Sequence, residues 1–177
     1  IKDFTQAMAS DPQYLAPYVN RGMLLMHLGR YREAQEDLRK LCDLWGDAGA
    51  LLLLYTIQVR AGNDQAAKTL LQARQRLRPN ERHDALVIDM LQRRISSREA
   101  LDSIADDTLD SCSRKTEIWY HAGQMCLAQG RKDLARKAFA ECTALKKPWS
   151  AEATWAKREL KLLDAEVQRT ADRDATH

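Results

Sequence analysis

The chain has 177 residues, of which 45% are apolar and 30% charged, a composition typical of about one globular domain. The formal net charge is only +3 and no basic stripe accompanies it, which argues against nucleic acid or an acidic membrane as the partner. No apolar run reaches the roughly 18 to 20 residues needed to cross a bilayer, so direct membrane insertion is not expected.

Residues 1–47 contain one complete sequence repeat and the end of another. Within residues 15–47, the fourth, eighth, eleventh, fifteenth, twentieth and twenty-fourth positions are Tyr18, Gly22, Leu25, Gly29, Ala34 and Leu38. This order of large and small residues resembles the tetratricopeptide repeat, a unit of about 34 residues that forms two antiparallel helices. Phe4, Ala7 and Pro12 match the end of such a unit, so residues 1–14 are expected to hold the second helix of a truncated repeat. The natural protein is therefore expected to be longer at its N-terminus.

Residues 48–81 follow the same pattern with three departures. The unit keeps large, small and turn residues at Leu51, Leu54, Gly62, Ala67, Leu71 and Pro79. Its eighth position, normally small, is Tyr55, and the polar residues Gln58 and Arg74 occupy positions that are normally apolar. The pattern predicts that both helices form but that the pair splays apart.

Residues 82–115 have the length of a repeat but only a weak pattern. A helix is predicted over residues 84–94, with Ala85, Ile88 and Leu91 on one face. Ser96 or Ser97 is expected to cap a short helix that ends near residue 104. Residues 106–113 are polar and are predicted to form a turn. This degenerate repeat, with its shortened second helix, is expected to bend the array.

The last part of the chain returns to the regular pattern and then closes it. In residues 116–149 the repeat positions are filled by Trp119, Ala122, Gly123, Gly130, Ala135 and Phe139. Residues 150–168 are predicted to form a capping helix with a polar outer side, and residues 169–177 a mobile polar tail. Together the patterns predict an all-α fold over residues 1–168, a single domain in which antiparallel helix pairs form a right-handed superhelical solenoid.

The residues that usually carry chemistry do not form a recognisable site in this sequence. The four cysteines, Cys42, Cys112, Cys126 and Cys142, lack C-x-x-C spacing, so they are interpreted as buried thiols or, for the last two, as a disulfide. The four histidines show no H-E-x-x-H spacing, and neither a phosphate-binding glycine loop nor a nucleophile elbow is present. We therefore predict no catalytic, metal or cofactor site, and a protein that is not an enzyme.

A partner surface is predicted on the first helix of each repeat. Helical periodicity turns the second, fifth, ninth, twelfth and thirteenth positions to one side, where they would form an apolar trough with an arginine rim. We define this predicted trough by Val19, Met23, Met26, Leu52, Leu86, Met90, Tyr120 and Leu127, with Arg60, Arg93 and Arg94. Of these, Met23, Leu52, Met90 and Tyr120 are predicted to anchor a protein or peptide segment. Filling by the degenerate repeat or by the C-terminal helix, and a homodimer contact, are the alternatives.

One familiar partner is disfavoured by two of these positions. Repeats that hold the C-terminal carboxylate of heat-shock chaperones carry Lys at the fifth and Asn at the ninth position of the first unit. Here those positions are Val19 and Met23, and neither side chain can bind a carboxylate.

The order of regular and degenerate repeats also resembles the NlpI family of bacterial outer-membrane lipoproteins. The residues that carry this resemblance are in segments 20–22, 34–38 and 65–68, in the break near Ile95 and in the Ala-Glu-Ala start of the closing helix. The resemblance implies a dimeric envelope adaptor that scaffolds peptidoglycan hydrolases and brings substrates to a periplasmic protease. It also implies a periplasmic location with an outer-membrane anchor. The rival interpretations are a self-associating structural module and a cytoplasmic scaffold in a regulatory complex.

Overall fold

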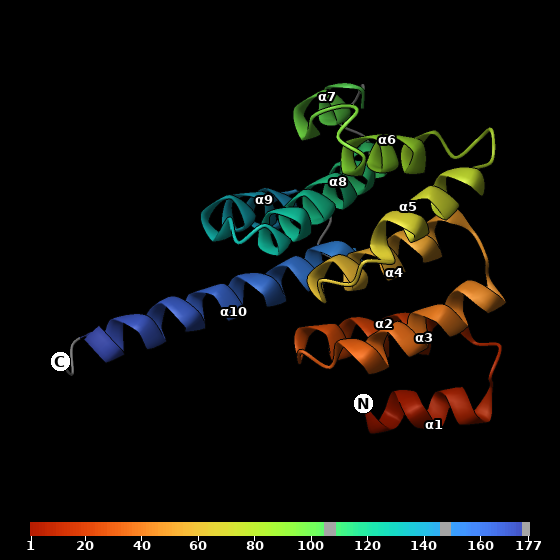
Figure 1. The fold of residues 1–177 in the computed structure, drawn as a ribbon, viewed down its shortest axis with the longest axis horizontal. Coiled ribbons are helices and arrows are strands. Elements are labelled where there is room, and N and C mark those ends of the chain that lie inside the picture. The colour runs from red at the N-terminus through yellow and green to blue at the C-terminus, as the bar shows by residue number, and fades with distance from the viewer. Residues whose placement is uncertain (105–108, 146–149, 175–177) are drawn as a thin grey trace. The chain divides into compact units, whose positions relative to one another are not determined.

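The computed structural model of the protein describes residues 1–104, 109–145 and 150–174 (Figure 1). All regular secondary structure in these residues is α-helical, which confirms the predicted all-α fold. Two compact units are present, a first unit of residues 1–94 and a second unit of residues 95–177. The boundary lies inside the segment predicted to be a degenerate repeat. The superhelical arrangement of the whole chain stays a prediction.

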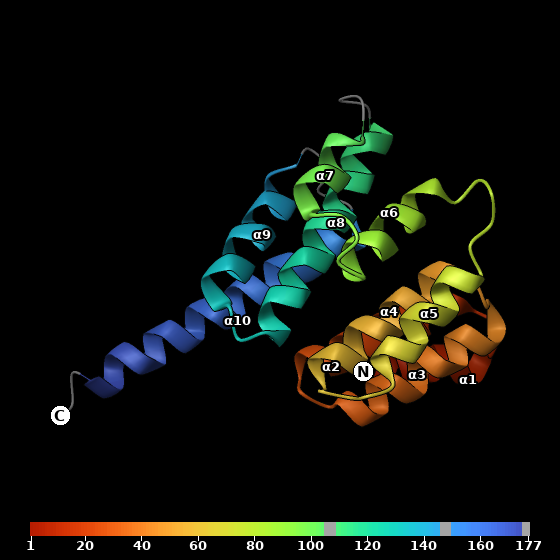
Figure 2. The same cartoon turned by 45° about the horizontal axis from the view of Figure 1, so that its top comes forward.

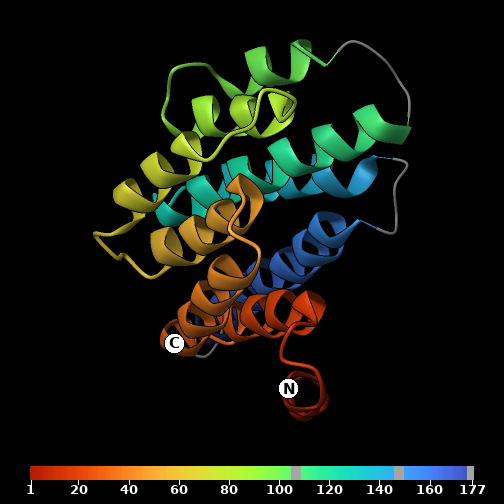
Figure 3. The same ribbon diagram turned by 90° about the vertical axis from the view of Figure 1, so that its right-hand side faces the viewer.

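The first unit is built from six helices that pack in chain order. Their bounds are α1 Lys2–Ser10, α2 Leu15–His27, α3 Tyr31–Leu44, α4 Ala48–Arg60, α5 Ala66–Gln75 and α6 Arg82–Leu91. Figure 3 shows α2 beside α3, and α4 beside α5, as antiparallel neighbours joined by short turns. Helices α2 and α3 are the two helices predicted for residues 15–47, and α1 is the expected second helix at the start of the chain.

Close backbone approach and a buried ion pair hold α2 against α3. A Cβ atom at Gly22 would lie 2.1 Å from Leu38 Cδ2, so only glycine allows this spacing. One residue earlier, Arg21 Nε and Nη2 donate to the two Asp37 carboxylate oxygens at 2.8 and 2.6 Å. These bonds raise the pKa of Arg21 above its usual value. The guanidinium therefore stays charged beside a carboxylate that is almost fully buried.

Helix α5 is turned relative to the repeat pattern. The side chains that it buries include Ala66, Leu70 and Ala73, each one position before the residue expected to pack. The expected residues Ala67 and Leu71 are exposed, so this part of the prediction is wrong. The turn before the helix explains the difference, because the Asn63 side chain accepts a bond from the Gln65 amide at 2.9 Å and delays the helix start. A one-residue change of register rotates a helix face by about 100°.

The second unit consists of α7 Ser97–Asp102, α8 Leu109–Ala128, α9 Lys132–Ala144 and α10 Ala151–Asp174. The predicted cap of α7 is confirmed, because Ser96 Oγ accepts from the Glu99 amide and the Glu99 carboxylate accepts from the Ser96 amide. The turn predicted for residues 106–113 is wrong for residues 109–113, which belong to α8; residues 106–108 lie outside the described residues. An ion pair from Arg114 to Asp110 and a bond from Thr116 Oγ1 to the Cys112 carbonyl stabilise this extra turn of helix.

Helix α10 closes the second unit and is longer than predicted. Ser150 caps its start, since the Ser150 hydroxyl accepts from the Ala153 amide at 2.9 Å. The helix continues to Asp174, so the mobile tail predicted from residue 169 is wrong for residues 169–174; residues 175–177 lie outside the described part. In Figure 2 its C-terminal half extends beyond α8 and α9. No described helix combines the length and the hydropathy that a membrane span needs.

Candidate functional site

The structure buries most of the apolar residues assigned to the predicted trough. Met23, Met26, Leu52, Met90 and Tyr120 are each at most 5% exposed, although they were expected to face a partner. Half-buried positions are Val19, Arg60, Leu86 and Leu127, while Arg93 and Arg94 are exposed. The four proposed anchors therefore do not present open surface to a partner in this structure, because packing within the folded chain already covers them.

Tyr120 shows which element covers such a residue. Its ring lies 6.1 Å from that of Phe139 on α9 and 5.6 Å from that of Trp155 on α10, measured between ring centroids. One helical turn further along α8, Gln124 Nε2 donates to the buried Glu159 carboxylate at 2.9 Å. In the second unit, the C-terminal helix thus occupies the face that was expected to receive a partner. This is the self-filling alternative.

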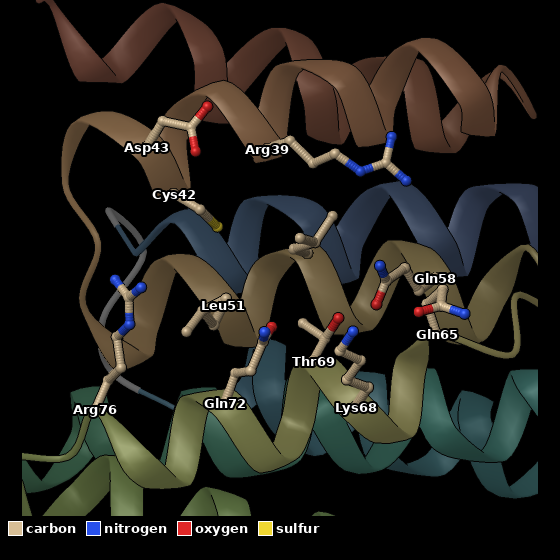
Figure 4. Close-up of a pocket in the computed structure, with 11 residues that line it drawn as sticks. Arg39, Cys42, Asp43, Leu51, Gln58, Gln65, Lys68, Thr69, Gln72 and Arg76 are labelled. Atoms are coloured by element: carbon tan, nitrogen blue, oxygen red, sulfur yellow. The ribbon is translucent and has the colours of Figure 1, made fainter.

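An open groove is present instead in the first unit, between α3 and α5 with α4 as its floor (Figure 4). Its volume is about 540 Å³. We define this α3–α5 groove by its lining residues, which are Arg39, Cys42 and Asp43 from α3, Leu51, Leu54 and Gln58 from α4, and Gln65, Lys68, Thr69, Gln72 and Arg76 from α5 and its two ends. The buried side chains Leu51, Leu54, Gln58 and Thr69 form the floor, and exposed polar side chains form the rim.

Gln58 is the unusual residue of this groove. It is 3% exposed, and its Oε1 atom has no hydrogen-bond partner among the described residues. More than about nine in ten buried polar groups in proteins have a partner, and an unpaired one costs about 1–3 kcal/mol. The equivalent position of the preceding repeat is the apolar residue Leu25. A buried acceptor of this kind makes Gln58 a candidate contact for a ligand that supplies the missing donor.

The cationic side chains of the rim are held in different ways. Arg39 Nη2 donates to Gln35 Oε1 at 3.1 Å, and the same oxygen accepts from Asn63 Nδ2 at 2.8 Å. Arg76 Nη1 donates to the Gly46 carbonyl at 2.7 Å, whereas Lys68 has no bonding partner within the described part of the chain. Both tethered guanidinium groups keep further N–H donors free for a ligand.

The groove has the chemistry of a binding surface. Burial raises the pKa of the Cys42 thiol to about 11, with a smaller contribution from Asp43. The thiol therefore stays protonated at neutral pH and is a poor nucleophile. Among residues 1–104, 109–145 and 150–174, no group of three His, Cys, Asp or Glu side chains is placed to hold a metal ion. All four cysteines are free thiols, so Cys126 and Cys142 are not bonded to each other.

The sequence marks one residue of the groove, Gln58, as unusual but does not indicate its role in binding. In the sequence, Gln58 is a polar residue at an apolar repeat position, and this pattern predicts only that the helix pair splays. Arg74 is the second polar residue at an apolar repeat position, and its structural role is clear: its Nη1 atom donates to Asp89 on α6 at 2.5 Å. Arg39 and Lys68 carry no signal in the sequence, because exposed basic residues on helices are common.

A comparison with known protein families identifies two regions of the chain that match a repeat family. The tetratricopeptide repeat family matches residues 15–44 and 116–148. These two segments correspond to the pairs α2–α3 and α8–α9, which supports a tetratricopeptide-repeat protein. Repeats of this kind generally mediate protein–protein interaction and are typically non-catalytic. The pair α4–α5, which supplies most of the groove, lies outside both matched segments.

Proposed function

We propose that this protein is a non-catalytic adaptor that binds a segment of another protein in the α3–α5 groove. The buried Gln58 side-chain carbonyl, which has no hydrogen-bond partner on the groove floor beside Leu54, is the observation that carries the proposal. Protein surfaces of this kind combine apolar contact area with a few polar groups that fix the orientation of the ligand. The match to a repeat family whose members generally bind proteins supports the same function.

Site-specific photocrosslinking in cells tests this proposal. A photoreactive amino acid in place of Gln72, an exposed residue that lines the groove, is expected to give discrete covalent adducts with a partner protein. The matched control is Lys40, an exposed lysine on α3 that does not line the groove, and it should not give those adducts. Adducts between two copies of this chain would support the self-association interpretation instead. Identical patterns from both positions, or no adduct, would refute the groove as the binding surface.

The exposed rim of the predicted trough is a second candidate surface. Arg93 borders another groove of the first unit, lined by apolar side chains that include Val59 and Leu71. Leu71 is 51% exposed as a result of the turned α5. A photoreactive group at Arg93 examines this surface in the same experiment. Adducts from Arg93 but not from Gln72 would move the proposed adaptor function from the α3–α5 groove to this surface.

A finer form of the proposal is an envelope adaptor related to the NlpI family. It is supported by the sequence resemblance in segments 20–22, 34–38 and 65–68, the last of which contains Lys68. Mass spectrometry of the Gln72 adducts tests it directly. Peptidoglycan hydrolases or a periplasmic protease among the adducts would support an envelope role. Cytoplasmic proteins alone would refute it and leave the adaptor function intact.

A further inference from the structure

We infer that the α3–α5 groove binds an extended, acidic peptide segment. This inference rests on the proposed adaptor function and assigns its partner a chemical class. It follows from three properties of the groove that are argued in turn: the atom without a partner, the length between its two ends, and the distribution of charge along its rim.

The unpartnered Gln58 oxygen selects an extended chain over a helix. Gln58 Oε1 is an acceptor, so its ligand must present an N–H or O–H donor at the groove floor, and an extended backbone supplies one whatever its side chains are. The backbone N–H groups of a helix beyond its first turn are already bonded within the helix. An extended segment leaves its N–H groups unpaired and can donate one of them to Gln58. On the floor, Leu51 and Leu54 carry no donor, and the Thr69 hydroxyl makes no bond to Gln58 Oε1.

The length of the groove sets the size of the segment. Along α5 the lining runs from Gln65 to Arg76, which corresponds to roughly 16 Å at the helical rise per residue. About five residues of extended chain cover this distance. Successive side chains of such a chain point to opposite sides, so every second residue would contact the floor at Leu51 and Leu54. Apolar residues are expected at these alternate positions.

The charge of the rim selects acidic residues at the remaining positions. The exposed lining contains three cationic side chains, Arg39, Lys68 and Arg76, against the single carboxylate of Asp43. Figure 4 shows Lys68 near Gln58 and Gln65 at one end, and Asp43 with Arg76 at the other. A carboxylate of the ligand is therefore attracted to the end with Gln58 and Lys68, and Asp43 disfavours one at the opposite end.

Selection from a display library of short random linear peptides tests the inference on the full chain. Peptides enriched by the wild-type protein should carry Asp or Glu towards one end and apolar residues at alternate positions. The enrichment should be lost with Lys68→Glu and kept with Lys40→Glu, which makes the same change of net charge outside the groove. Enrichment without acidic residues, or no enrichment, would overturn the inference. So would acidic enrichment that survives Lys68→Glu.

Fluorescence anisotropy with an enriched, capped peptide then examines the two contacts separately. Lys68→Glu is expected to weaken binding about tenfold or more, with Lys40→Glu within about twofold of wild type. N-methylation of the amide that faces Gln58 should weaken binding to the wild type but not to Gln58→Leu. An equal loss in both proteins would show that Gln58 does not accept from the ligand. If crosslinked partners are found from Gln72 while acidic peptides fail, the adaptor function stands and the acidic ligand is refuted.

Discussion

Replacing Gln58 by leucine should make the protein more stable, although it removes the residue that we assign to ligand binding. Gln58 is 3% exposed and its Oε1 atom has no partner. An unpaired buried group costs about 1–3 kcal/mol, and leucine instead adds apolar burial beside Leu51 and Leu54. The repeat formed by α2 and α3 accepts leucine at the same position, where Leu25 is 2% exposed. We expect a gain of about 1–2 kcal/mol in the free energy of unfolding.

Urea denaturation followed by circular dichroism measures this gain. With a slope of about 1–3 kcal/mol per molar, a gain of 1 kcal/mol raises the midpoint by about 0.3–1 M. The matched control is Gln72→Leu, the same chemical change at an exposed groove residue, which should stay within about 0.5 kcal/mol of wild type. A Gln58→Leu protein less stable than wild type by about 1 kcal/mol or more would refute the reasoning, because Gln58 would then have a partner in the folded protein.

Three further predictions concern packing, charge and pH. Gly123→Ala should lower the stability by about 1–3 kcal/mol, since its Cβ would lie 2.4 Å from Phe139 Cε1; an unchanged urea midpoint would contradict this. Arg21→Met should cost about 3 kcal/mol, because the Asp37 carboxylate, 4% exposed, loses its guanidinium; a loss no larger than that from Asp37→Asn would argue against the cause. Burial raises the pKa of the Cys142 thiol from 9.0 to about 12. The buried, protonated thiol therefore contributes its full share to the stability of the fold below pH 9, and this contribution is lost as pH rises towards 12. Cys142→Ala should make this decline in stability with pH less steep. Identical pH profiles of stability for the variant and the wild type would exclude the thiol as its cause.

The regular helix pairs could be predicted because their side-chain sizes permit one arrangement. Gly22 leaves room for the Leu38 side chain and Gly123 for that of Phe139, because a Cβ atom at either glycine would collide with its neighbour. The register of α5 could not be predicted in this way, since it depends on the turn in which Asn63 bonds to Gln35 and to the Gln65 amide. A side chain–backbone bond of this kind leaves no periodic signal in a sequence.

The burial of most apolar residues of the predicted trough could not be predicted for a related reason. Periodicity placed Tyr120 on one face of its helix but carries no information about which other element covers that face. Trp155, which covers it, lies on a helix whose own pattern indicated only a cap. The α3–α5 groove was missed for the opposite reason. Its anomaly at Gln58 was visible in the sequence, but the absence of a hydrogen-bond partner is a property of the folded structure alone.

The packing of α10 on α8 suggests the design of a synthetic peptide that replaces α10. Trp155 and Glu159 are four residues apart, so they lie on one side of α10 and meet Tyr120 and Gln124 together. A chain shortened to end before residue 150 would expose the receiving surface. A synthetic copy of residues 150–166 should then bind to it and restore lost helicity, as titration calorimetry and circular dichroism would measure. An equal affinity for a copy with alanine at both contact positions would show that these two side chains do not specify the fit.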